Sequence, residues 1–88
     1  MSVFIGGSAY NMVRDIADGY IIATERTFRN FGGKELADFQ QEATRLVQEV
    51  RADQPALTDT MAIQRRQRRL QRLMQSLSIV GAIVQRRR

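Results

Sequence analysis

The sequence predicts an all-α protein of 88 residues, either a helical hairpin or a three-helix bundle with a long C-terminal helix. Apolar residues recur at helical spacing over most of the chain, which indicates amphipathic helices. A Gly-Gly pair at 32–33 and the single proline divide this pattern into three stretches. We therefore expect one domain over residues 1–88, with helices at about 8–30, 34–52 and 56–85.

The first stretch runs from about Ser8 to Asn30. Ser8 is the expected N-cap, because its hydroxyl can accept a hydrogen bond from a backbone N–H in the first turn. Gly19 and several β-branched residues lower the helix propensity, so packing has to stabilise this segment. A strand at Tyr20–Thr24 is the alternative. The apolar positions are Tyr10, Val13, Ile16, Ala17, Tyr20, Ile21, Phe28 and Phe31.

The second stretch, Lys34 to Ala52, has apolar residues at alternating spacings of three and four, which is typical of the a and d positions of a coiled coil. The preceding glycines suit a chain reversal, because glycine reaches left-handed backbone angles easily. Glu35 in the first turn and Arg51 in the last turn agree with the helix dipole. The seam residues are Leu36, Phe39, Ala43, Leu46 and Val50.

The third stretch follows Asp53-Gln54-Pro55, because proline disfavours a helical conformation in the residue before it. This helix is expected to start near Pro55, with Asp53 as its N-cap, or near Thr58, with Thr58 as its N-cap. It is expected to run to about Gln85. At 1.5 Å per residue the second helix is roughly 28 Å long and the third roughly 42 Å. The C-terminal end therefore projects from a hairpin, unless the first helix covers it.

Basic residues are concentrated at the C-terminal end of the chain. Eight of the fourteen Lys and Arg residues fall within residues 65–88, and no acidic residue follows Asp59. Residues 1–59 carry a formal charge of −3 and residues 60–88 carry +8, so the two parts can attract each other within or between molecules. The basic patch consists of Arg65, Arg66, Arg68, Arg69, Arg72, Arg86, Arg87 and Arg88.

These features predict a small structural protein that self-assembles or docks to a protein partner through its C-terminal amphipathic helix. The projecting end of this helix is apolar around most of its circumference, at Leu77, Ile79, Val80, Ile83 and Val84. An apolar surface without an internal partner predicts an external one. In this interpretation Arg65–Arg72 pair with acids of a neighbouring subunit, namely Glu35, Asp38, Glu42 and Glu49. The residues assigned to the partner interface are Leu70, Leu73, Met74, Leu77, Val80, Ile83 and Val84.

The alternative is a nucleic-acid-binding module in which the Arg65–Arg72 cluster contacts phosphates, because guanidinium groups bind phosphate through charge and paired hydrogen bonds. The glutamines at 64, 67, 71 and 75 can contact bases. No aromatic residue follows Phe39, however, and aromatic side chains are common base-reading residues.

The composition argues against catalysis and metal binding. The chain has no cysteine and no histidine, so disulfides, thiolate ligands and imidazole ligands are all excluded. Acid–base chemistry would fall to Asp, Glu, Tyr or the single Lys34, and no catalytic set emerges from their spacing. We expect no enzyme activity, no metal, no cofactor and no small-molecule substrate.

Membrane association is also not expected. The most apolar stretch, Leu77–Val84, has eight residues, whereas a spanning helix needs roughly twenty. Met1–Gly7 has no basic n-region and does not fit a signal peptide. The arginines surround the last helix instead of forming one polar face, which argues against an interfacial helix. We expect a cytoplasmic location or a place in a macromolecular assembly.

The turn Gln54-Pro55-Ala56-Leu57 and the closing Ile83-Val84-Gln85 resemble the small subunits of type III secretion needles. Those subunits are short, cysteine-free helical hairpins whose C-terminal helix lines a polymer. The resemblance covers the C-terminal third of the chain, and the arginine cluster departs from the family's pattern. It implies that such a layout can serve a filament, so a subunit of a needle-like or viral helical assembly is a further alternative.

Overall fold

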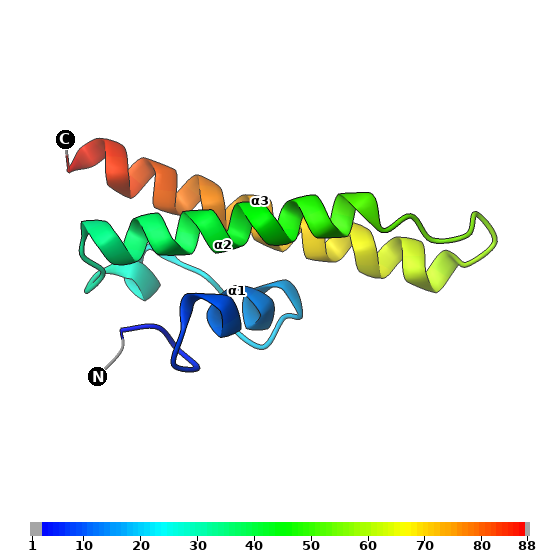
Figure 1. Ribbon diagram of the computed structural model, residues 1–88, viewed down its shortest axis with the longest axis horizontal. Helices are drawn as coiled ribbons and strands as arrows, with labels where there is room; N and C mark the ends of the chain where they lie inside the picture. Colours follow the sequence, from blue (N-terminus) through cyan, green and yellow to red (C-terminus); the bar gives the residue numbers. More distant parts are fainter. Residues whose placement is uncertain (1–2, 88) are drawn as a thin grey trace.

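The computed structural model describes residues 3–87 and contains three α-helices and one short 3-10 helix (Figure 1). Their order is α1 (Ala9–Ala17), η1 (Glu25–Phe28), α2 (Gly33–Ala52) and α3 (Thr60–Arg86). Within residues 3–87 there is no β-strand. The long helices α2 and α3 form an antiparallel hairpin, and α1 packs against both of them. The predicted all-α fold with a long C-terminal helix is confirmed.

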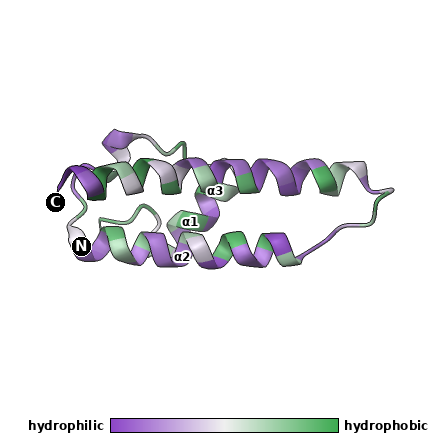
Figure 2. Cartoon of the chain, turned by 90° about the horizontal axis from the view of Figure 1, so that it is seen from above, coloured by the Kyte–Doolittle hydropathy of each residue, from purple (hydrophilic) through white to green (hydrophobic). Residues whose placement is uncertain are grey.

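Aromatic and aliphatic side chains from all elements form one core. The predicted seam of α2 is confirmed, because all five of its residues are buried. Hydrophobic and hydrophilic segments alternate along α2 and α3, as this one-sided burial requires (Figure 2). Phe28 of η1 contacts Phe39 of α2 and Phe31 edge to face, with interplanar angles of 69° and 84° and centroid distances of 4.9 and 5.2 Å. This edge-to-face geometry is favourable for aromatic pairs and fixes η1 against the hairpin.

The first helix is shorter than predicted and ends at Ala17, not near Asn30. Ser8 is the N-cap as expected, with its Oγ accepting from the N–H of Asn11 at 3.1 Å. The end is set by Gly19, whose φ of +85° is a left-handed conformation that terminates a helix. The N–H groups of Gly19 and Tyr20 donate to the carbonyls of Ile16 and Asp15, at 3.2 and 2.9 Å. These two bonds are those of a Schellman motif.

The segment between α1 and α2 is neither the predicted helix nor the alternative strand. Residues 20–24 form a bend and an extended stretch, followed by η1. Tyr20 and Ile22 are exposed, whereas Phe28 and Phe31 are buried. On a continuous helix Tyr20 and Phe31 would lie on the same face, because they are about three turns apart. The break in the helix lets Tyr20 stay exposed while Phe31 is buried.

The last helix starts at Thr60, later than either predicted start. Its N-cap is Asp59, whose Oδ1 accepts from the N–H of Ala62 at 3.1 Å, so neither Asp53 nor Thr58 has this role. Residues 53–56 are outside regular structure, and the connection extends beyond the end of α2 (Figure 1).

The C-terminal end of α3 is covered within the chain. η1 contacts α3, and its Phe28 packs against Phe39 of α2, so η1 lies against the hairpin near the C-terminal part of α3 (Figure 2). Val80 and Ile83 are buried, and Leu77, Ile79 and Val84 are partly buried against the core. The prediction that this end projects uncovered from the hairpin is therefore wrong. The alternative, that the segment predicted as the first helix covers it, is correct for the part of that segment that forms η1. The physical reason is the early end of α1, which frees the following residues to pack along α3.

Candidate functional site

The structure describes seven of the eight residues of the basic patch; Arg88 lies outside the described residues. Five of the seven contact other parts of their own chain, and they do so mainly at the ends of helices. The carbonyl groups in the last turn of a helix lack intrahelical partners and carry partial negative charge. Arginines are therefore suited to these positions.

Arg66 binds the C-terminal turn of α2. Its Nε donates to the carbonyl oxygen of Val50 at 3.2 Å, and its Nη2 donates to that of Arg51 at 3.1 Å. No glycine ends α2, since the C-cap is Asp53 in an extended conformation. Arg66 supplies the donors that a glycine-based cap would otherwise supply from the backbone.

Arg69 and Arg72 bind the C-terminal turn of α1. The Nη1 of Arg72 donates to the carbonyl oxygen of Ala17 at 3.1 Å, and the Nε of Arg69 lies 3.3 Å from Oδ1 of Asp18. A Cβ built on Gly19 would lie 3.0 Å from Cζ of Arg72. The missing side chain at Gly19 therefore leaves the space that Arg72 occupies.

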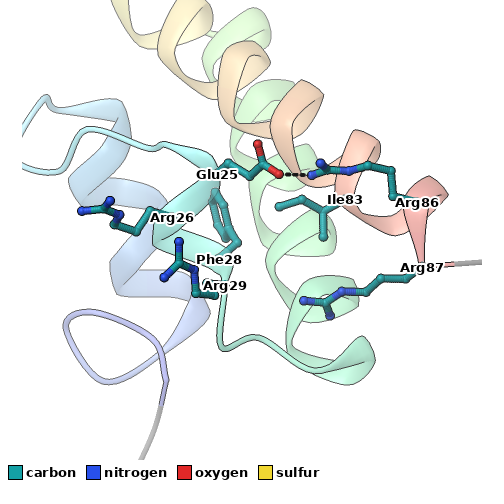
Figure 3. A pocket seen from close by; sticks show the side chains of 7 residues that line it. All are labelled: Glu25, Arg26, Phe28, Arg29, Ile83, Arg86 and Arg87. Atoms are coloured by element: carbon teal, nitrogen blue, oxygen red, sulfur yellow. Dashed lines mark hydrogen bonds and ion pairs between the residues drawn. The ribbon is translucent and has the colours of Figure 1, made fainter.

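Arg86 and Arg87 bind the region of η1. Arg86 forms an ion pair with Glu25, and Nη1 of Arg87 donates to the carbonyl oxygen of Phe31 at 2.6 Å. The close view in Figure 3 shows that Phe28 and Ile83 lie between these arginines and two others, Arg26 and Arg29. Together these residues line a groove of about 570 Å³, here called the Phe28 groove; its seventh lining residue is Glu25.

The two remaining arginines of the patch, Arg65 and Arg68, are exposed, and their side chains make no hydrogen bond or ion pair with residues 3–87. They line a second groove, of about 450 Å³, between α3 and the chain that follows α1. We call it the Tyr20 groove. Its lining residues are Ala17, Asp18, Tyr20, Met61, Gln64, Arg65, Arg68, Arg69 and Arg72.

A third groove, of about 340 Å³, lies between residues 19–23 and α3, and it shares Arg72 with the Tyr20 groove. The three grooves follow α3 from Met61 to Arg87. Eight arginines and two carboxylates line them, a formal charge of +6. We call these eight residues the arginine strip: Arg26, Arg29, Arg65, Arg68, Arg69, Arg72, Arg86 and Arg87.

Three residues of this surface were missed by sequence reasoning. Arg26 and Arg29 come from a segment that was predicted to be one continuous helix, far in sequence from the basic patch. Tyr20 was assigned to an apolar helix face, but 82% of it is exposed, next to Arg65 and Arg68. The sequence signal for Tyr20 is Gly19, because a left-handed glycine ends the helix and turns the next residue outward.

The residues assigned to a partner interface occupy different environments. Leu73, Val80 and Ile83 belong to the core of the single chain. Leu70, Leu77 and Val84 are partly buried against that core, and Met74 is 47% exposed. Of the acids expected to pair with a neighbour, Glu49 and Glu42 form ion pairs with Arg14 and Arg45 in the same chain, at 3.4 and 3.7 Å.

Residues 3–87 contain no group of three acidic side chains close enough to hold a metal ion. No helix in that part of the chain is both long and apolar enough to cross a membrane. Comparisons with protein-family models, curated proteins and solved structures give no match to this chain.

Proposed function

We propose that the protein binds nucleic acid along the arginine strip. The observation that carries this proposal is the charge of the three grooves beside α3, where eight arginines accompany only two carboxylates. A row of cationic side chains on one surface attracts the phosphate backbone and releases its counterions. The strip follows most of a 27-residue helix, so it has the length to contact several successive phosphates.

Four residues of the strip are free to bind phosphate directly. Arg26, Arg29, Arg65 and Arg68 are exposed and have no hydrogen-bond or ion-pair partner among the described side chains. A guanidinium group donates two parallel hydrogen bonds to phosphate oxygens, which gives both affinity and orientation. The other four arginines already contact their own chain, namely Arg69, Arg72, Arg86 and Arg87. They stay in place, and their charges add to the positive electrostatic potential of the surface.

Electrophoretic or fluorescence-polarisation binding of a labelled mixed-sequence oligonucleotide tests this proposal. We expect binding at low salt and a linear fall of log affinity with log salt concentration. The double variant Arg65→Gln/Arg68→Gln is expected to weaken binding at least about tenfold and to reduce the salt slope by about 1.4, the value for two phosphate contacts on a single strand.

The chain offers a matched control in Arg45→Gln/Arg51→Gln, which removes the same charge from α2, outside the three grooves. This control should bind almost as the unmodified protein does. Equal losses in both double variants would show that only net charge matters and that the strip is not the binding surface. An absence of binding at low salt would remove the proposal altogether.

A second candidate, self-association or docking to a protein partner, is favoured by a different observation. Leu57, Met61 and Ile22 are 94%, 71% and 84% exposed. Exposed large apolar side chains become favourable contacts when a partner covers them. Sedimentation equilibrium up to high micromolar concentration tests this candidate, with Met61→Ser/Ile22→Ser as the variant expected to dissociate any assembly. A strict monomer over that range contradicts self-association.

A further inference from the structure

We infer that Tyr20 stacks on an unpaired base, so that the preferred ligand of the arginine strip is single-stranded nucleic acid. This inference rests on the proposed function and adds the kind of nucleic acid to it. It depends on three observations: the position of the Tyr20 backbone, the exposure of its side chain, and the two free arginines in the same groove.

The backbone of Tyr20 is fixed. Its N–H donates to the carbonyl oxygen of Asp15 at 2.9 Å, as part of the Schellman motif that ends α1. In this motif the residue at the Tyr20 position often makes an apolar contact with the last turn of the helix. Here the residues it would contact are Arg14 and Asp15, which are not apolar. The backbone is therefore held, while the side chain lacks the apolar contact that often accompanies this motif.

Tyr20 is 82% exposed, and an exposed aromatic side chain on a fixed backbone is a stacking platform. Base–aromatic stacking does not depend on sequence, because every base has a π-face. A tyrosine also loses little conformational freedom when it binds, since its side chain has few rotatable bonds. The ring lines the Tyr20 groove with Gln64, whose amide is available to a base edge.

Arg65 and Arg68 complete the arrangement. They are three residues apart in α3 and lie on the same groove as Tyr20, which places them along one side of the helix. Phosphates on either side of a stacked base can therefore be bound by neighbouring guanidinium groups. A duplex cannot use this platform, because its bases already stack on each other and show only their edges. The arrangement thus distinguishes a single strand from a duplex.

The experiment uses the full chain with Tyr10→Phe. The sequence has two tyrosines and no tryptophan, so Tyr20 is then its only tyrosine and dominates the intrinsic fluorescence. The probes are a mixed-sequence DNA oligonucleotide, the same oligonucleotide annealed to its complement, and inorganic polyphosphate as a polyanion without bases. We expect the single strand to quench Tyr20 and to bind about tenfold more tightly than the duplex.

Two further variants separate stacking from charge. Tyr20→Ala is expected to lose about ten- to a hundredfold of the single-strand affinity and little of the duplex or polyphosphate affinity, whereas Tyr20→Phe keeps the ring and the binding. Circular dichroism checks that each variant is folded. Equal single-strand binding by Tyr20→Ala overturns the inference, and so does equal affinity of the parent for single strand and duplex.

The failure of this inference and the failure of the proposed function give different results. If Arg65→Gln/Arg68→Gln weakens binding while Tyr20→Ala does not, nucleic-acid binding stands and stacking on Tyr20 is rejected. If no nucleic acid binds at low salt, both are rejected. If Tyr20→Ala instead dissociates an oligomer in sedimentation, and no nucleic acid binds, Tyr20 belongs to a protein contact and the inference is overturned.

Discussion

Arg72 donates a hydrogen bond from its Nη1 to the carbonyl oxygen of Ala17, 55 residues earlier in the chain, at 3.1 Å. This bond attaches the middle of the last helix to the C-terminal end of the first. Arg66 makes the equivalent connection to the end of α2, and Arg87 to Phe31 after η1. The arginines of α3 thus hold the ends of the elements that precede it, where the helix dipole favours positive charge.

Replacing Arg72 with Met keeps much of the side-chain length and removes the donors. We expect Arg72→Met to reduce the free energy of unfolding by about 1 kcal/mol, because the bond is charge-assisted but partly exposed. Urea denaturation followed by circular dichroism measures this change. Arg65→Met is the control on the same helix and should change stability by less than about 0.5 kcal/mol. If both variants unfold at the same urea concentration, the contact to Ala17 does not stabilise the fold.

Gly19→Ala should destabilise the protein for two reasons. The φ of +85° is unfavourable for an L side chain, and the new Cβ would lie 3.0 Å from Cζ of Arg72. The left-handed conformation alone costs about 1–2 kcal/mol. Thermal unfolding measures the loss. In an Arg72→Met background the steric part should disappear while the backbone part remains, so a double-mutant cycle separates the two contributions.

Gly81→Ala should have the opposite effect. Gly81 lies inside α3, its φ is not positive, and a Cβ there would meet no atom within 4 Å. Alanine is about 1 kcal/mol more favourable than glycine in a helix interior, so we expect a gain of up to that amount. A loss of stability that grows with protein concentration would mean that another helix packs closely against Gly81.

Phe28→Ala tests the position of η1. Phe28 is fully buried and contacts two other aromatic rings. Truncation of a buried phenylalanine costs about 3–5 kcal/mol, which is a large part of the stability of so small a domain. Circular dichroism and thermal unfolding should show a strongly destabilised or unfolded chain. Leu57→Ala is the exposed control and should be nearly neutral, so a comparable loss there would contradict the assigned core.

Arg26→Gln/Arg29→Gln tests how far the arginine strip extends. Both residues line the Phe28 groove, opposite Arg86 and Arg87 (Figure 3). If a nucleic acid follows the strip over its full length, this variant should weaken binding of a long oligonucleotide and reduce its salt slope. An oligonucleotide too short to reach both grooves should be affected less. Identical effects on short and long oligonucleotides would restrict the site to one groove.

The local pattern of the sequence determined the helical character of the chain, the seam of α2 and the N-cap at Ser8. Each of these depends on residues within a few positions of one another, since helix periodicity and capping are local. The predicted end of α1 and the predicted start of α3 were wrong, because several residues near each boundary could end or cap a helix. Gly19 counted only as a weak helix former, although in its left-handed conformation it ends α1. Asp59 caps α3, although Asp53 and Thr58 were chemically equivalent candidates.

Only the tertiary structure determined which groups the long arginine side chains contact. The sequence showed eight basic residues near the C-terminus, and the Arg65–Arg72 cluster was predicted to pair with acids of a neighbouring subunit or, as the alternative, with phosphates. Five of them instead bind carbonyls and acids of the same chain, because packing brings the ends of α1, η1 and α2 within reach of α3. The same packing places Tyr20, Arg26 and Arg29 beside the free arginines, a proximity that residues so far apart in sequence do not reveal.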